Sequence, residues 1–256
     1  MGRDEQWERA ADGTQVAPAC RPEHIDKLIS DVDRYNPQNA EVLVDYLGTQ
    51  MENGTYDALT NLALLKLYQL NQGEFNFDAV INVLLKALTA VPFPDFGLCI
   101  SLLGEAPLQT LKSAGAAELP SVDAAGIIVE PIIVRIATLS TFLFETKFRA
   151  FWEHYRSNEY ADVRQYAAAI ADFEPAVRQI ALNSVKGTFR TISQERLAGY
   201  LGLPVADLGA YLAGHPGWTL ADGKVAVPPN PDNQVKATVV REEISLENLS
   251  KLLSQA

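Results

Sequence analysis

The sequence predicts a mostly α-helical protein in which an irregular helical-repeat domain of the HEAT/TPR-like type is followed by a winged-helix domain and a C-terminal helix. Apolar segments of helix length alternate with short turns up to about residue 172, three more helical segments then precede a hairpin signal, and spaced leucines return near the end. We therefore expect four regions: a flexible arm over 1–22, helical repeats over 23–172, a winged helix over 173–230, and a linker with the last helix over 231–256.

The composition is that of an acidic globular protein. The 256 residues are 48% hydrophobic and carry a net charge of −11. Residues 1–173 hold 24 acidic and 13 basic side chains, whereas residues 174–256 hold 8 of each. An acidic body repels phosphate backbones, so this charge disfavours nonspecific binding to nucleic acid.

Several features predict a soluble cytoplasmic protein. The first residues lack the apolar stretch of a signal peptide, and the longest apolar run, 126–144, is interrupted by Glu130, Pro131 and Arg135. Cys20 lies in a polar arm and Cys99 in an apolar run, which argues against a disulfide framework and fits a reducing compartment.

The segment 56–70, YDALTNLALLKLYQL, is predicted to be a central helix. It contains no Gly or Pro, ten of its fifteen residues are apolar, and its polar residues do not gather on one stripe. A surface helix has one apolar face, whereas a helix that is apolar nearly all round packs between neighbours. We therefore expect this segment to be buried core.

Its neighbours follow from apolar spacing and turn residues. We expect helices over 23–34, 37–52, 77–91, 96–103 and 131–146, with a long loop over 104–126 that contains a short helix at 108–114. In the first two helices the residues expected to face inward are Ile25, Leu28, Ile29, Val32, Val42, Leu43, Tyr46 and Leu47. The segment 148–155 places four aromatic side chains on one helical face, which predicts core: Phe148, Phe151, Trp152 and Tyr155.

The pattern changes after residue 173. We expect a helix over 174–190, a short strand at 191–192, a helix that Ser193 caps, and a helix that Pro204 opens. Asp222-Gly223 between two short apolar runs is a hairpin signal. Three helices and a hairpin are the order of a winged-helix domain, a relative of the helix-turn-helix.

The third of these helices, 204–213, would be the recognition helix of a nucleic-acid reader. It contains Asp207 and no Lys or Arg, whereas contacts to bases and phosphates call for Arg, Lys, Asn or Gln. Protein docking or plain packing is therefore favoured over nucleic-acid reading on this face.

The sequence nominates no catalytic residue, no cofactor and no metal site. The histidines His24, His154 and His215 lie far apart without nearby cysteines or spaced carboxylates, and no nucleotide-binding or nucleophile motif is present. We therefore expect a protein that is not an enzyme.

Helical repeats that run directly into a winged helix resemble the PCI family of scaffold subunits, which the proteasome lid, the signalosome and eukaryotic translation initiation factor 3 share. Four segments narrow the resemblance to the k subunits of that initiation factor: DRYNP at 33–37, YDALTNLALLKLYQLN at 56–71, LLKALTAVPFPDF at 84–96 and FRAFW at 148–152. The resemblance spans about residues 24–227, which is most of the chain.

The resemblance implies a non-catalytic scaffold subunit that acts in translation initiation. It implies contact with other subunits of the factor, subunit l first and subunit e second, and with the small ribosomal subunit through the complex, without membrane binding or sequence-specific nucleic-acid binding. The expected protein contacts lie on the tail helix that starts at Ser245 and on the hairpin, whose edge strand a partner could extend. They are Leu246, Leu249, Leu252, Leu253, Trp218 and Val225.

Two alternatives stay open from the sequence. One is a PCI subunit of another complex, such as the signalosome or the proteasome lid. The other is a winged-helix protein that binds nucleic acid.

Overall fold

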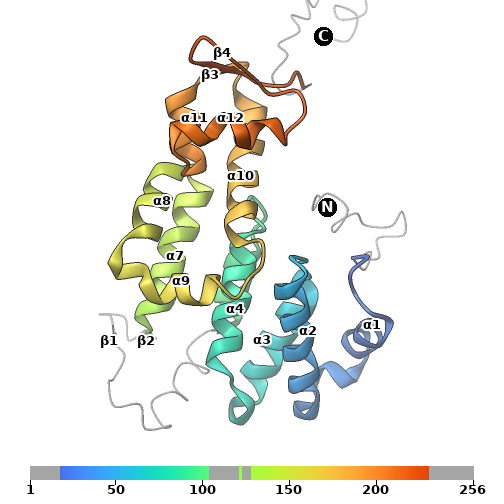
Figure 1. The fold of residues 1–256 in the computed structure, drawn as a ribbon. Helices are drawn as coiled ribbons and strands as arrows, with labels where there is room; N and C mark the ends of the chain where they lie inside the picture. Colours follow the sequence, from blue (N-terminus) through green and yellow to red (C-terminus); the bar gives the residue numbers. More distant parts are fainter. Residues whose placement is uncertain (1–17, 104–120, 123–127, 231–256) are drawn as a thin grey trace, which may run out of the picture.

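A computed structural model describes residues 18–103, 121–122 and 128–230 (Figure 1). The fold is mostly helical, as predicted, and its helices stack beside one another with a small sheet at one end. Residues 1–17 of the predicted arm over 1–22, the short helix at 108–114 and the tail helix that starts at Ser245 lie outside the described residues.

The N-terminal half is built from helices joined by short turns. In chain order they are α1 (Glu23–Ser30), η2 (Val32–Tyr35), η3 (Pro37–Asn39), α2 (Ala40–Glu52), α3 (Ala58–Leu70), η4 (Gln72–Glu74), α4 (Phe77–Leu88) and α5 (Asp95–Leu103). The side chain of Asp57 accepts the backbone N–H of Thr60 at the start of α3, and Asn76 does the same for α4. These caps satisfy helix N–H groups that have no partner inside the helix.

The second half continues the stack and ends in the sheet. Its elements are β1 (Ser121–Val122), β2 (Ile128–Val129), α7 (Pro131–Phe144), α8 (Phe148–Arg156), η5 (Asn158–Tyr160), α9 (Ala161–Ala167), α10 (Phe173–Thr188), β3 (Thr191–Ser193), α11 (Gln194–Leu201), α12 (Val205–Ala213), β4 (Thr219–Ala221) and β5 (Lys224–Ala226). Pro131 is the first residue of α7, where its missing N–H costs nothing.

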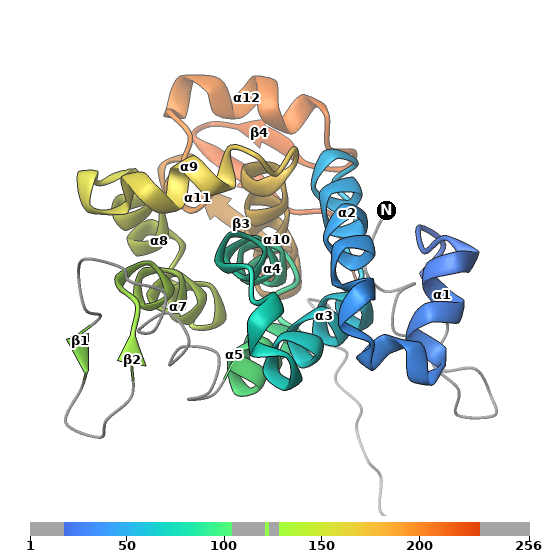
Figure 2. The same ribbon diagram turned by 90° about the horizontal axis from the view of Figure 1, so that it is seen from below.

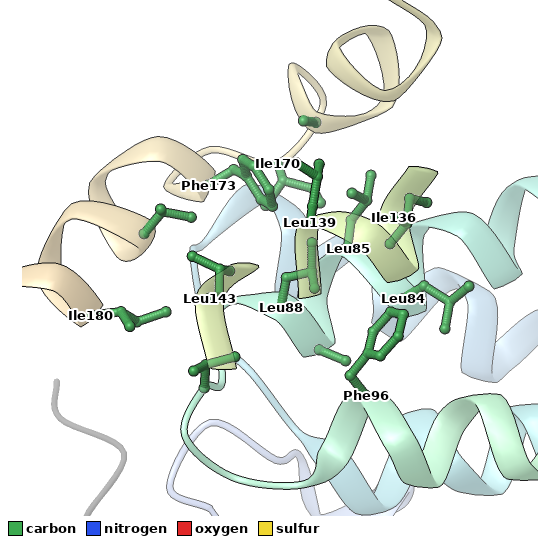
Figure 3. Close-up of a cluster of buried hydrophobic side chains, with 14 of the residues drawn as sticks. Leu84, Leu85, Leu88, Phe96, Ile136, Leu139, Leu143, Ile170, Phe173 and Ile180 are labelled. Carbon is green, nitrogen blue, oxygen red and sulfur yellow. The ribbon is translucent and has the colours of Figure 1, made fainter. Parts of the chain in front are cut away.

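The centre of the core is α4, not the segment 56–70 that the sequence favoured. Nine of the twelve residues of α4 are buried, and it contacts α2, α3, α5, α7 and α9. Figure 2, a view turned by 90°, shows α4 surrounded by these helices. In Figure 3 its Leu84, Leu85 and Leu88 lie among side chains of α5, α7 and α10.

The segment 56–70 does form a helix that is largely core, but one of its faces is uncovered. Leu59, Leu62, Ala63 and Lys66 of α3 are all partly exposed and recur at i, i+3, i+4 and i+7. The other faces pack against α1, η2, α2, α4 and α5. The expectation of burial all round was therefore wrong for this one stripe.

Two inward positions predicted for the first helices were also wrong. Val32 is 76% exposed because α1 ends at Ser30, and Asp31, in extended backbone, accepts the N–H of Val32 to start η2. Val42 is 38% exposed because α2 turns the neighbouring positions inward, among them the buried Leu43 and Leu47.

The aromatic segment of α8 is core, as predicted. Phe148, Phe151, Trp152 and Tyr155 are all at most 5% exposed. The rings of Phe151 and Tyr155 stack with centroids 5.7 Å apart, and Trp152 meets Phe151 edge to face at 5.2 Å. Rings of this size contribute large buried areas, and such pairs add about 1 kcal/mol beyond the area.

The predicted hairpin is present and forms part of a three-stranded antiparallel sheet. The strand order is β3-β5-β4, so β5 lies in the middle and β4 at an edge. Asp222 and Gly223 connect β4 to β5 with positive φ angles of 49° and 70°, as a two-residue hairpin turn requires. Ser193 precedes α11 without capping it through its side chain, which corrects the predicted cap.

Candidate interaction surface

The C-terminal elements are held against the helical repeats by Trp152 of α8. Its indole N–H donates a hydrogen bond of 2.9 Å to the carbonyl of Tyr200 in α11. Arg156 and Arg178 lie over the same ring, with guanidinium carbons 5.2 and 5.1 Å from its centroid. Cations over a tryptophan face are attracted by its quadrupole. We call these contacts the Trp152 joint, and they fix the position of the sheet and α12 relative to α8.

Gly202 makes this close approach possible. It follows α11 in the left-handed conformation, with φ 62°, and a Cβ built on it would lie 2.4 Å from Cδ2 of Trp152. Only glycine combines that backbone conformation with the missing side chain.

A surface with a single charged residue, Asp207, lies beyond the joint, and we name it the β4–α12 surface. In α12 only Leu208 and Leu212 are buried. All three residues of β4 are exposed, and Leu220 is 42% exposed. Leu220 lies beside Gly209 of α12: a Cβ added to Gly209 would be 3.9 Å from Cδ2 of Leu220. The exposed residues of the surface are Val205, Ala206, Asp207, Gly209, Ala210, Ala213, Thr219, Leu220 and Ala221.

This surface suits protein contact better than nucleic acid. Asp207 is the only charged residue of α12 and β4. Among the strands of the sheet, the basic residue is Lys224 of β5. Phosphate binding needs several Lys or Arg side chains. An edge strand with exposed apolar neighbours is instead open to strand addition or apolar packing by another protein.

The predicted site residues fall into three groups. Val225, in the middle strand, is fully buried, so its side chain contributes to the core beneath the sheet. Trp218 is partly buried and packs against that core just before β4. Leu246, Leu249, Leu252 and Leu253 lie outside the described residues.

Sequence reasoning missed the two exposed apolar residues that stand out on this surface, Val205 and Leu220. The sequence did contain a signal for Val205: α12 is rich in apolar residues but buries only Leu208 and Leu212, so other apolar residues must lie on its surface. The sequence contained no such signal for Leu220, because its exposure depends on β4 being an edge strand of the sheet.

The histidines have structural surroundings. His154 lies 4.8 Å from the ring of Phe142, and its Nδ1 is 2.9 Å from the carbonyl of Ala150. The ring of His215 lies tilted against that of Tyr211, with centroids 4.8 Å apart. Among the described residues no three His, Cys, Asp or Glu side chains gather as metal ligands would.

Two buried titratable groups are also held by packing. Burial raises the pKa of the Cys99 thiol to about 12, so the thiol stays protonated and unreactive at neutral pH. Burial lowers the pKa of Lys86 to about 8, and its Nζ donates to the carbonyl of Gln50 at 3.2 Å. None of the helices that the structure describes is both long and apolar enough to cross a membrane.

Comparison with protein-family models gives a match over residues 74–239 to the CSN8/PSMD8/EIF3K family. The match runs from the end of η4 through the sheet, and thus includes the joint and the β4–α12 surface. The chain belongs to this family.

Curated relatives of the family extend the similarity to nearly the whole chain. The chain is 51% identical to a protein of Mycosarcoma maydis, over 97% of this chain and 96% of that one. It is 35% identical to a protein of Sclerotinia sclerotiorum, over 92% and 94% of the two chains, and 38% identical to one of Cryptococcus neoformans, over 93% of each. All three are named eukaryotic translation initiation factor 3 subunit K, which confirms the resemblance found in the sequence.

Proposed function

We propose that this chain is a non-catalytic scaffold subunit of eukaryotic translation initiation factor 3, and that it works in the cytoplasm in the initiation of protein synthesis. The observation that carries the proposal is the β4–α12 surface, which has exposed apolar side chains, no cation and one carboxylate, on a chain whose relatives are named as one subunit of that factor. A scaffold needs a rigid, partner-facing surface and no reactive group, and the Trp152 joint supplies the rigidity.

The proposed partners are other subunits of the factor. We take subunit l as the first partner and subunit e as the second, with the small ribosomal subunit reached through the complex. Strand addition at β4 would satisfy backbone groups of the edge, while Leu220 and Val205 would be buried by the partner. Burying two such side chains contributes about 3 kcal/mol in total.

The tail is proposed as a second contact. Leu246, Leu249, Leu252 and Leu253 fall on one side of a helix at their sequence spacing, and so short a helix needs a partner to be stable. The chain truncated after Asn230 should keep its thermal transition but co-purify poorly with the factor. Normal co-purification of the truncated chain would contradict this contact.

Two measurements separate the alternatives. Affinity purification of the full chain with mass spectrometry should recover subunits of initiation factor 3, and recovery of signalosome or proteasome-lid subunits instead would overturn the assignment. Titration of the full chain with single-stranded and double-stranded oligonucleotides at 50 and 200 mM salt should give no steep salt dependence. A loss of affinity of 100-fold or more between these salts would favour a nucleic-acid binder.

A further inference from the structure

The uncovered stripe of α3 is the floor of a groove at the end of the molecule away from the sheet (Figure 1). The groove has a volume of about 690 Å³. Its floor is formed by Leu59, Leu62 and Ala63, which lie on one face of α3 because they are three and four residues apart. Apolar side chains on this floor stay partly exposed to water.

The walls of the groove come from different elements. On one side lie Ile29 of α1 and Tyr35 of η2, and on the other lies Leu102 of α5. Tyr35 is 41% exposed. The lining also contains Arg21, Asp26, Ser30, Arg34 and Lys66, so the apolar floor lies between partly polar sides. This combination fits an amphipathic helix with anchors at i, i+3, i+4 and i+7.

The rim of the groove is basic although the whole chain carries a charge of −11. Arg34 and Lys66 make no ion pair within the described part of the chain: Lys66 donates to the Gln69 side chain at 2.8 Å, and Arg34 donates to the Ile29 carbonyl at 3.3 Å. Arg21 also lines the groove and is shared by two carboxylates: it pairs with Asp26 at 2.9 Å and with the buried Asp57 at 2.7 Å. Arg21, Arg34 and Lys66 together therefore outnumber these two carboxylates by one positive charge, which favours carboxylates on the occupant.

We propose that this groove binds an amphipathic helix of a partner protein whose apolar face is flanked by Asp or Glu. The apolar floor calls for leucine-like anchors, and the two rim cations call for carboxylates beside them. A nucleic acid would leave that floor uncovered. The groove shares no residue with the β4–α12 surface, so this contact is additional to the proposed docking of the C-terminal elements.

The test places the photo-crosslinker p-benzoyl-phenylalanine at Tyr35 of the full chain, because this replaces one rim aromatic with another. Irradiation in intact cells, followed by mass spectrometry, identifies the segment that reacts. We expect one segment of another protein, with apolar residues at helical spacing and Asp or Glu beside them. Its yield should fall at least fivefold when Arg34→Glu and Lys66→Glu are added. The same crosslinker at Phe144, which is 43% exposed on α7, should not capture it, because no residue of α7 lines the groove.

Four outcomes would overturn the proposal. They are no crosslink from Tyr35, a crosslink to residues 1–17 of the same chain, a crosslink to a second copy, and a partner segment without acidic residues or unaffected by the charge reversal. Because the reaction is read in cells from the captured segment itself, the result does not depend on which complex the chain joins.

Discussion

The indole N–H of Trp152 donates its hydrogen bond to the carbonyl of Tyr200 across 48 positions of sequence, and so joins α8 to α11. Trp152 is only 3% exposed, and the carbonyl belongs to the last turn of a helix, where it lacks an intrahelical partner. The hydrogen bond therefore ties the C-terminal elements to the stack of helices.

Replacing Trp152 with Phe should lower the free energy of unfolding by about 2 kcal/mol, because a buried carbonyl loses its donor and a small cavity opens. Urea denaturation followed by circular dichroism measures this. Trp218→Phe is the matched control: Trp218 is only partly buried, and less than 1 kcal/mol is expected. Equal losses in the two variants would mean that the Trp152 hydrogen bond contributes nothing particular.

Gly202→Ala should destabilise the protein by about 3 kcal/mol or more. The new methyl group would lie 2.4 Å from Cδ2 of Trp152 in addition to the cost of a φ of 62°. Gly223→Ala has a φ of 70° but no neighbour within 4 Å of the built Cβ, so about 1 kcal/mol is expected there. Thermal melts of both variants separate the steric contribution from the backbone contribution. Similar melting temperatures would contradict the close packing at the joint.

Arg21 is the buried partner of Asp57. Its Nε and Nη2 donate to the two carboxylate oxygens at 2.7 and 2.8 Å, and the two side chains are 4% and 1% exposed. Arg21→Leu leaves a buried carboxylate without its cation and should cost about 3 kcal/mol or more in urea denaturation. Lys27→Ala removes the cation of the exposed pair with Glu23 and should change stability by less than 0.5 kcal/mol. A small effect of Arg21→Leu would show that the ion pair does not hold residues 18–22 in place.

Lys86 gives a pH dependence of known sign. Burial lowers its pKa from 10.5 in the unfolded chain to about 8 in the folded one, so between these values the unfolded state binds more protons. Stability from this group therefore rises as the pH increases from about 8 to 10.5. Lys86→Met removes the titration, so the stability of the wild type relative to this variant should increase by about 2 kcal/mol between pH 7 and pH 10. Urea denaturation of both proteins at pH 7, 8.5 and 10 measures it, and a constant difference would contradict the lowering of the Lys86 pKa by burial.

What the sequence could predict was set by local chemistry. The Asp222-Gly223 hairpin follows from turn geometry and the aromatic face of α8 from helical spacing, so both were recognised before the structure. The central place of α4 and the Arg21–Asp57 pair, 36 positions apart, depend on how distant elements pack, and no local pattern encodes them.

The uncovered stripe of α3 illustrates the same limit at a candidate site. An apolar residue that lines a groove and one that fills a core look alike in sequence, so Leu59 and Leu62 were expected to be buried. Exposed Leu220 was missed because its exposure depends on β4 lying at the edge of the sheet, which the sequence does not show.

The most direct test of the proposed scaffold role is the affinity of the purified full chain for purified subunit l of the initiation factor. Introducing Val205→Asp and Leu220→Asp together places two charges on the β4–α12 surface, where the wild-type residues are 40% and 42% exposed. Val134→Asp with Phe144→Asp is the matched control on α7, at 41% and 43% exposure. Calorimetry should give an affinity at least tenfold weaker for the first pair and unchanged for the control, whereas binding within twofold of wild type for the first pair would contradict docking through this surface.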